Sequence, residues 1–286
     1  CMGGGSVANE MMDLFGFHED LATTSAFVQQ RAKIRPEAFE KLFDLFVRNT
    51  AERSTYCGLQ LLAVDGSDFL TASNPDDPDS FFPGTEAQKS YNLLHLNALY
   101  DLTRHVYVDA LLQKRRCEDE CGALVNMIDR SELMNVLLLA DRGYESYNVL
   151  AHLQEKGWKF LIRVKDGTGG VASGLDLPTT TTFDRPITLS LTKKQSNEVK
   201  QLLNDRNHYK LVPHTSRFDF LPERSRKHDP NVFYPLSFRI ARFPITENTF
   251  ETVVTNLDAD DFPPSELKKL YAMRWGIETS FRELKY

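Results

Sequence analysis

Hydrophobic and polar positions alternate along the chain in patterns that predict successive helices and strands. Between residues 20 and 50, the apolar side chains recur every three or four positions, at Phe39, Leu42, Phe43 and Phe46. This period predicts a helix whose apolar face packs on a core. Pro36 stands where that helix would begin, and the threonine and serine run at 23–25 offers a cap for an earlier helix.

The middle of the chain predicts alternating strands and helices. Strand-like apolar runs occupy residues 59–71, 92–100, 105–113, 136–140 and 158–164. Helical patterns occupy 118–133 and 147–156, the second stopped by Gly157. The succession of strand, helix and strand at 136–164 implies a parallel pair joined by a right-handed crossover.

The remaining segments are loops, a β-rich stretch and a final helix. Residues 73–90 and 166–182 are rich in loop-forming residues. Residues 183–255 show short alternating runs, and we expect no helix there. A long helix is expected from about residue 266 to the end of the chain.

The composition is that of an ordinary globular protein with a substantial core. The 286 residues are 41% hydrophobic and 26% charged. Four cysteines form neither a disulfide framework nor a complete zinc-binding pattern, which fits a reducing cytosol. No apolar run approaches the roughly 20 residues of a membrane-spanning helix, and we expect no membrane partner.

Charge is distributed unevenly along the chain. The net charge is −6, which argues against a uniformly basic surface for nucleic acid. Residues 51–90 hold seven acidic and two basic residues, whereas residues 193–242 hold eleven basic and five acidic ones. This asymmetry predicts a cation-attracting region and a polyanion-attracting region, or two surfaces that are merely solvated differently.

Two aspartates stand out by their places in the pattern. Asp65 and Asp141 each end a predicted apolar strand, and each is followed within two residues by glycine. Open α/β sheets bind ligands where the chain leaves the strands, so neighbouring strands would bring the two carboxylates together. Taken alone, either aspartate is more simply explained by a turn.

The last helix gathers four polar side chains on one face. They are spaced by three, four and seven residues, as Tyr271, Arg274, Glu278 and Lys285. At about 100° per residue they lie within about 60° of one another. A solvated face with an ion pair would explain this spacing, but the apolar flank and the central Trp275 and Gly276 favour a packed, functional face.

This helix resembles the signature of a known enzyme family. The segment YAMRWGIETSFRELK at 271–285 matches the Y-(2)-R-(3)-E-(6)-K pattern of DDE transposases from bacterial insertion sequences. ADRGY at 140–144 resembles the segment of the family's second aspartate, and VDGS at 64–67 resembles the first. LHLNALYD at 94–101 is also similar, and the resemblance extends over residues 24–286.

The resemblance implies an α/β fold with a ribonuclease H-like mixed sheet flanked by helices. A β-rich insertion would precede the last catalytic helix. The expected parts are a partial N-terminal helical region (1–50), the first part of the core (51–166), the insertion (167–256) and the helix that completes the core (257–286).

It also implies a metal-binding catalytic triad of Asp65, Asp141 and Glu278, with Asp68 as the alternative to Asp65. Two Mg²⁺ ions about 4 Å apart, or Mn²⁺ in their place, would activate the nucleophile and stabilise the transition state and the leaving oxygen. Asp65 is expected to bridge both ions. Hard cations prefer oxygen ligands and offset the repulsion among acids.

The resemblance implies DNA contacts around this triad. Tyr271, Arg274 and Lys285 would hold phosphates near the cut, and Trp275 would stack on a flipped base, although a buried core tryptophan explains it as well. Further candidates for contacts with DNA are Arg142, Arg217, Arg224, Arg226 and Lys227. For the last four, a flexible basic loop is the alternative.

The implied function is cut-and-paste DNA transposition in the bacterial cytoplasm, on the nucleoid. Its partners would be double-stranded DNA, as terminal inverted repeats and target, and a second copy in a homodimer on the DNA. The alternatives are a ribonuclease H-like nuclease without strand transfer and a catalytically silent, truncated DNA-binding remnant. The family normally continues beyond the lysine of the signature, so we expect a fragment, a degenerate copy or a trimmed chain.

Overall fold

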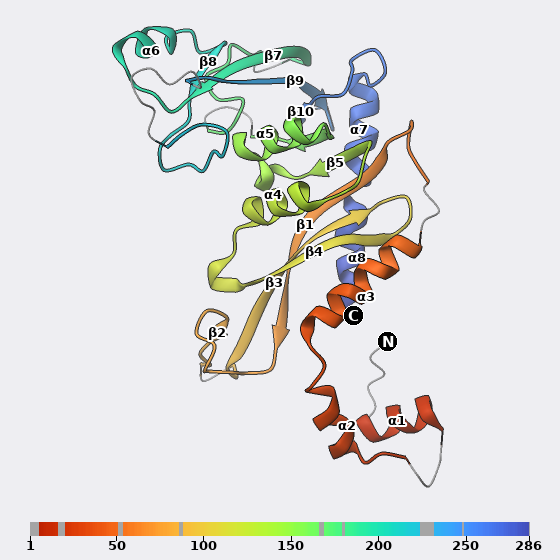
Figure 1. The fold of residues 1–286 in the computed structure, drawn as a ribbon. Coiled ribbons are helices and arrows are strands. Elements are labelled where there is room, and N and C mark those ends of the chain that lie inside the picture. The colour runs from red at the N-terminus through yellow and green to blue at the C-terminus, as the bar shows by residue number, and fades with distance from the viewer. Residues whose placement is uncertain are drawn as a thin grey trace. The chain divides into compact units, whose positions relative to one another are not determined.

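The computed structural model describes residues 6–16, 21–50, 54–85, 88–165, 169–178, 181–223, 232–247 and 249–285. Two compact units, Cys1–Glu52 and Arg53–Tyr286, make up the chain (Figure 1). The first unit holds the helices α1 (Val7–Phe15), α2 (Thr24–Arg31) and α3 (Pro36–Asn49). Thr23 caps α2 and Pro36 opens α3, as the sequence predicts.

The apolar face of α3 differs from its prediction. Phe39, Leu42 and Phe46 are each more than half exposed, so the expectation that they face a core is wrong for this structure. The helical period was identified correctly. Periodicity reports which side of a helix is apolar, whereas burial depends on what covers that side.

The second unit is built on one large sheet with helices on both faces. Its strands are β1 (Gln60–Thr71), β2 (Phe81–Phe82), β3 (Tyr91–Asp101), β4 (Val106–Lys114), β5 (Val136–Ala140), β6 (Lys159–Arg163), β7 (Phe183–Thr192), β8 (Tyr209–Leu211), β9 (Tyr234–Pro244) and β10 (Phe250–Thr255). Its helices are α4 (Glu120–Arg130), α5 (Tyr147–Lys156), α6 (Asn197–Leu202), α7 (Pro264–Met273) and α8 (Trp275–Lys285). Short 3-10 turns, η1 (Arg115–Cys117) and η2 (Arg142–Tyr144), precede α4 and follow β5.

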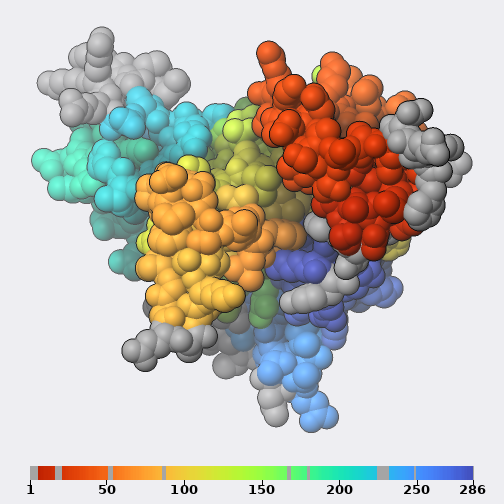
Figure 2. All heavy atoms as spheres, turned by 90° about the horizontal axis from the view of Figure 1, so that it is seen from below, coloured from red at the N-terminus to blue at the C-terminus, as the bar shows by residue number. Residues whose placement is uncertain are grey.

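The strand order explains how the core and the β-rich stretch join. Within the described residues the order is β2-β3-β1-β5-β6-β10-β9-β7-β8, and β4 also pairs with β3. Strands β1, β5 and β6 are parallel neighbours, which confirms the predicted crossover through α5. Strand β10 pairs with β6, so the β-rich stretch continues the core sheet. The far ends of β1 and β3, with β2, form the orange lobe of Figure 2.

The central strands are buried on both faces, as parallel strands covered by helices must be. On one face, Leu62 and Leu138 pack in a cluster with residues of α4 and α5. On the other face, Ala63 and Leu139 pack with residues of α7 and α8. Successive side chains of a strand point to opposite faces, so this alternation determines which helices each strand residue can meet.

Three predicted elements need correction. The stretch 183–255 contains a short helix, α6, where none was expected. The last helix is interrupted at Arg274, which separates α7 from α8. Strand β1 matches the predicted run 59–71, but Asp65 lies inside it rather than at a strand end, as had been expected. The pairing of β1 with β3 explains why the strand continues past Asp65, because this pairing continues to Thr71 after the pairing with β5 has stopped.

The predicted fold class is confirmed: a mixed α/β sheet flanked by helices. Cys57, Cys117 and Cys121 are free thiols. Of the helices in the described ranges, none has the length and apolar character needed to cross a bilayer.

Candidate active site

The parallel register of β1 and β5 places Asp65 beside Asp141. Ala63 pairs with Leu139, and each aspartate comes two residues later along its own strand direction. Both therefore lie at the same level of the sheet, on the face that Ala63 and Leu139 share with α7 and α8. The sheet thus brings together two residues that are far apart in the sequence.

Glu278 reaches this place from the first turn of α8. Its neighbours Ile277 and Phe281 are buried in the cluster that also contains Ala63 and Leu139. The carboxylates of Asp141 and Glu278 both act electrostatically on Asp65. The three predicted triad members are therefore close enough to influence one another.

The environment of Asp65 disfavours its negative charge. Burial is the largest cause and, together with Asp141 and Glu278, it raises the pKa of Asp65 from 3.8 to about 6. The Gly66 N–H, which donates to Asp65 Oδ1 at 2.9 Å, and the Arg274 guanidinium act in the opposite direction. Burial outweighs these two stabilising contacts, so the negative charge of Asp65 is disfavoured in the fold.

The oxygens of this triad are of the kind that divalent cations take as ligands. One oxygen of each acid is bound by the protein: Gly66 N–H to Asp65 Oδ1 (2.9 Å), Gly143 N–H to Asp141 Oδ1 (2.7 Å) and Arg274 Nη2 to Glu278 Oε1 (2.7 Å). No donor from the described part of the chain reaches the second oxygen of any of the three. Carboxylate oxygens that are oriented but still available are the ligands that Mg²⁺ and Mn²⁺ prefer.

The face predicted on the last helix is divided between buried and exposed side chains. Tyr271 and Arg274 are each 5% exposed, and the hydroxyl of Tyr271 has no hydrogen-bond partner. Lys285 is exposed, with its Nζ 5.2 Å from the centre of the Phe69 ring. Only part of this face is therefore open to a DNA backbone, whereas Arg274 is placed to orient Glu278.

Trp275 is an exposed residue. It is 59% accessible, and the Arg274 Cζ atom lies 5.1 Å from its ring centre. The alternative of a buried core tryptophan is therefore wrong for Trp275. Trp158 is the buried tryptophan of the chain, and its indole N–H donates to the Leu133 carbonyl at 3.1 Å.

The other basic candidates are spread over the second unit. Arg142 is exposed in η2, directly after Asp141. Arg217 is 61% exposed and donates to Asp219. Arg224, Arg226 and Lys227 lie outside the described residues.

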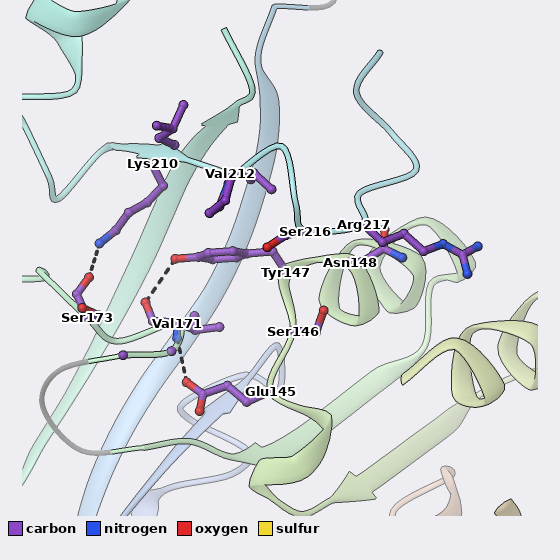
Figure 3. A pocket seen from close by; sticks show the side chains of 14 residues that line it. Glu145, Ser146, Tyr147, Asn148, Val171, Ser173, Lys210, Val212, Ser216 and Arg217 are labelled. Atoms are coloured by element: carbon purple, nitrogen blue, oxygen red, sulfur yellow. Dashed lines mark hydrogen bonds between the residues drawn. The ribbon is translucent and has the colours of Figure 1, made fainter. Parts of the chain in front are cut away.

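Arg217 borders a pocket of about 420 Å³ between the start of α5 and the β-rich stretch (Figure 3). Tyr147 donates to the Val171 carbonyl there, and the Val171 N–H donates to Glu145 at 2.6 Å. Lys210 donates to the Ser173 carbonyl on the same side. These contacts engage Tyr147, Glu145 and Lys210 with backbone groups of the pocket, and the guanidinium of Arg217 points away from the other labelled side chains.

Asp68, the alternative to Asp65, takes part in a separate cluster. It accepts from His95 Nδ1 at 2.7 Å and from Arg115 Nε at 3.1 Å. One ligand atom each of Asp68, His95 and Glu118 lie within 4.8 Å of one another, as in a metal site. Arg115 forms ion pairs with both acids, so a protein cation already balances this cluster. The geometry therefore supports Asp65 as the partner of Asp141.

Sequence reasoning missed two side chains near the triad, Glu120 and His95. Glu120 opens α4, and its Oε1 lies 3.1 Å from Nε2 of His95, a buried residue of β3. A helix was expected over 118–133 without Glu120 being singled out in it, and only the pairing of β1 with β3 could place these groups beside Gly66.

The chain is similar to known transposases. The chain is 23% identical to "Transposase InsG for insertion sequence element IS4" of Escherichia coli K12, over 98% of this chain and 57% of the relative. It is 28% identical to "Putative transposase InsZ" of the same organism, over 48% of each chain. The chain thus spans about half the length of the curated relatives it matches.

A solved piggyBac transposase synaptic complex with hairpin DNA is 12% identical, with a TM-score of 0.41, over 91% of this chain and 47% of that one. The family model described as "Transposase DDE domain" matches residues 56–286. These residues include every element that positions Asp65, Asp141 and Glu278, and the chain belongs to the DDE transposase domain family.

Proposed function

We propose that this chain is the catalytic part of a DNA transposase, which cleaves the ends of an insertion sequence and joins them to target DNA with the help of divalent cations. One observation supports this most directly. Asp65, Asp141 and Glu278 come from β1, the end of β5 and α8, and both Asp141 and Glu278 lie within electrostatic reach of Asp65. The curated relative InsG is named as the transposase of an insertion sequence element.

The three acids would hold two Mg²⁺ ions, or Mn²⁺, through the oxygens that the protein leaves without a donor. Bound there, the ions would polarise the scissile phosphate and lower the pKa of the attacking water or hydroxyl. Gly66 and Gly143 orient the two aspartates through their N–H groups, and Arg274 orients Glu278. Asp65, between the other two acids, is suited to the bridging position.

Exposed side chains around the triad are suited to contact DNA. Trp275 offers a ring for base stacking beside Arg274, and Lys285 and Arg142 offer charges for phosphates. Counterion release would make this binding fall steeply between about 50 and 200 mM salt. Equal affinity at both salt concentrations would contradict the proposed backbone contacts.

The proposed reaction involves three further partners. They are the terminal inverted repeats, the target duplex and a second copy of the chain on the DNA. Such a reaction would take place on the nucleoid of a bacterial cell.

The test is a cleavage assay with DNA that carries the inverted repeats flanking the gene. Wild-type protein is expected to nick this DNA only when Mg²⁺ or Mn²⁺ is present, and Asp141→Asn and Glu278→Gln are expected to abolish nicking. Glu283→Gln is the matched control, because Glu283 lies on the same helix but is exposed and away from the triad. Nicking by Asp141→Asn in Mg²⁺ would refute the assignment.

A second assay separates strand transfer from simple hydrolysis. Cleaved ends are incubated with a supercoiled plasmid, and covalent joining is measured on a gel. Joined product supports a transposase, whereas cleavage without joining supports a nuclease. If the wild-type protein binds DNA but does not cleave it, the chain is a catalytically silent remnant.

A further inference from the structure

A fourth carboxylate, Glu120, lies next to the triad from the opposite side of the sheet. Glu120 is the first residue of α4, the helix that packs on the face away from α7 and α8. His95 Nε2 lies 3.1 Å from Glu120 Oε1, and His95 Nδ1 lies 2.7 Å from Asp68 Oδ1. His95 is 5% exposed, so this ring holds the Glu120 side chain from within the protein.

Two glycines make room for this carboxylate. A methyl group at Gly66 would lie 2.6 Å from Glu120 Oε1 and would also collide with the His95 ring. A methyl group at Gly143 would lie 2.9 Å from Asp141 Oδ1 and 3.7 Å from Glu120 Oε2. Gly143 therefore lies close to oxygens of both Asp141 and Glu120, and Glu120 also lies against Gly66, the residue that follows Asp65.

His95 faces one oxygen of Glu120 and the Gly143 N–H binds one oxygen of Asp141, but their second oxygens have no donor among the described residues. Glu120 Oε2 receives no hydrogen bond from any described residue. The hydroxyl of Tyr144 is also without a partner, although Tyr144 is only 1% exposed. Burial, followed by Glu120, Asp65 and Asp141, raises the pKa of that hydroxyl, which places it among the same carboxylates. Neighbouring carboxylates whose second oxygens lack a donor are unfavourable unless a cation or its bound water lies there.

We propose that Glu120 is a fourth carboxylate of the catalytic cation site, beside Asp141, and that His95 is the positioning residue that holds it there. This inference rests on the proposed function, because it assigns a further ligand to the same cations. It also accounts for glycine at positions 66 and 143, where any side chain would enter the site.

The test is the affinity for Mn²⁺ alone, measured on the full chain without DNA by the electron paramagnetic resonance signal of free Mn²⁺. Glu120→Gln keeps the shape of the side chain and an oxygen that accepts from His95. It is expected to weaken Mn²⁺ binding about tenfold or more. Glu283→Gln is the matched control, since Glu283 is an exposed glutamate of α8, and the affinity of this variant is expected to stay within about twofold of wild type.

The role of His95 has its own test. His95→Ala is expected to weaken Mn²⁺ binding as Glu120→Gln does, whereas His95→Gln, which retains an N–H donor, should recover part of the loss. If Glu120→Gln fails to fold by circular dichroism, Glu120→Asp replaces it, because the charge is kept but withdrawn by one methylene. Wild-type Mn²⁺ affinity in the folded Glu120 variant would overturn the inference.

The two proposals fail in different ways. If wild-type protein cleaves DNA, Asp141→Asn does not, and Glu120→Gln binds Mn²⁺ and cleaves normally, the inference about Glu120 is wrong and the proposed function stands. If Mn²⁺ binding depends on Glu120 but no cleavage occurs, the cation site stands and the transposase proposal is refuted. If the wild type binds no Mn²⁺, both are refuted.

Discussion

Replacing Asp65 with asparagine is expected to stabilise the metal-free protein at neutral pH. Burial, with Asp141 and Glu278, raises the pKa of Asp65 from 3.8 to about 6, so at pH 7 the folded chain holds an unfavourable charge. Asparagine has nearly the same shape and keeps an oxygen that accepts from the Gly66 N–H. The substitution therefore removes the charge without opening a cavity.

The sign and size follow from proton linkage. Because the pKa is higher in the folded state, the unfavourable contribution is absent below about pH 4, grows as pH rises toward 6 and is complete above it. A tenfold change in proton affinity corresponds to about 1.4 kcal/mol. Raising the pKa from 3.8 to about 6 therefore corresponds to a loss of about 3 kcal/mol in the free energy of unfolding. Solvent around the partly exposed carboxylate reduces the expected gain to about 2 kcal/mol.

The assay is thermal unfolding in EDTA at pH 4 and pH 7.5, followed by the fluorescence of the buried Trp158. Asp65→Asn is expected to raise the Tm by roughly 5 °C at pH 7.5 and to leave it unchanged at pH 4. Added Mg²⁺ should raise the Tm of the wild type and have little effect on the variant.

Asp68→Asn is the control, three residues further along the same strand. Asp68 is paired with His95 and Arg115, so removing its charge should destabilise the protein. If Asp65→Asn has the same Tm as wild type or a lower one at pH 7.5, then the fold does not disfavour the charge of Asp65. The electrostatic argument for a cation site would then fail.

Three further predictions concern other residues. Trp275→Ala should change the free energy of unfolding by less than about 0.5 kcal/mol but weaken binding of DNA that carries the inverted repeats by about 1–3 kcal/mol. In a Trp158→Phe background, Trp275 fluorescence that does not respond to this DNA would contradict stacking. Arg274→Ala should lower the free energy of unfolding by about 3 kcal/mol in urea titrations, because it leaves Glu278 without its buried partner; an unchanged midpoint would contradict this. Burial acts to raise the pKa of Asp219, but hydrogen bonds from three neighbouring side chains outweigh it and lower that pKa to about 2. The stabilising contribution of the Asp219 charge is present above about pH 4 and lost as pH falls toward 2. Asp219→Asn should therefore destabilise the protein at pH 7 and weaken the dependence of its stability on pH below about 4. An unaltered pH profile of stability would show that the Asp219 charge is not stabilised in the fold.

The candidate site was only partly predictable. Asp141 follows a short, wholly apolar strand, and Glu278 sits in a dense signature, so both could be identified from local residues. Asp65 was placed at a strand end, whereas β1 continues past it through its pairing with β3. Glu120 could not be identified at all, because nothing in the charged run around it distinguishes a carboxylate that turns inward from one in water.

By itself, the sequence determined most of the local elements of this protein. The strand at 136–140, the helix at 147–156 and its end at Gly157 were predicted correctly, since periodicity and capping act over a few neighbouring residues. Only the tertiary structure decided which of these elements meet. The register that sets Asp65 beside Asp141 and the exposure of Trp275 depend on pairing and packing between segments far apart in the chain. No local pattern encodes such contacts, because their energy exists only once the partner segment is in place.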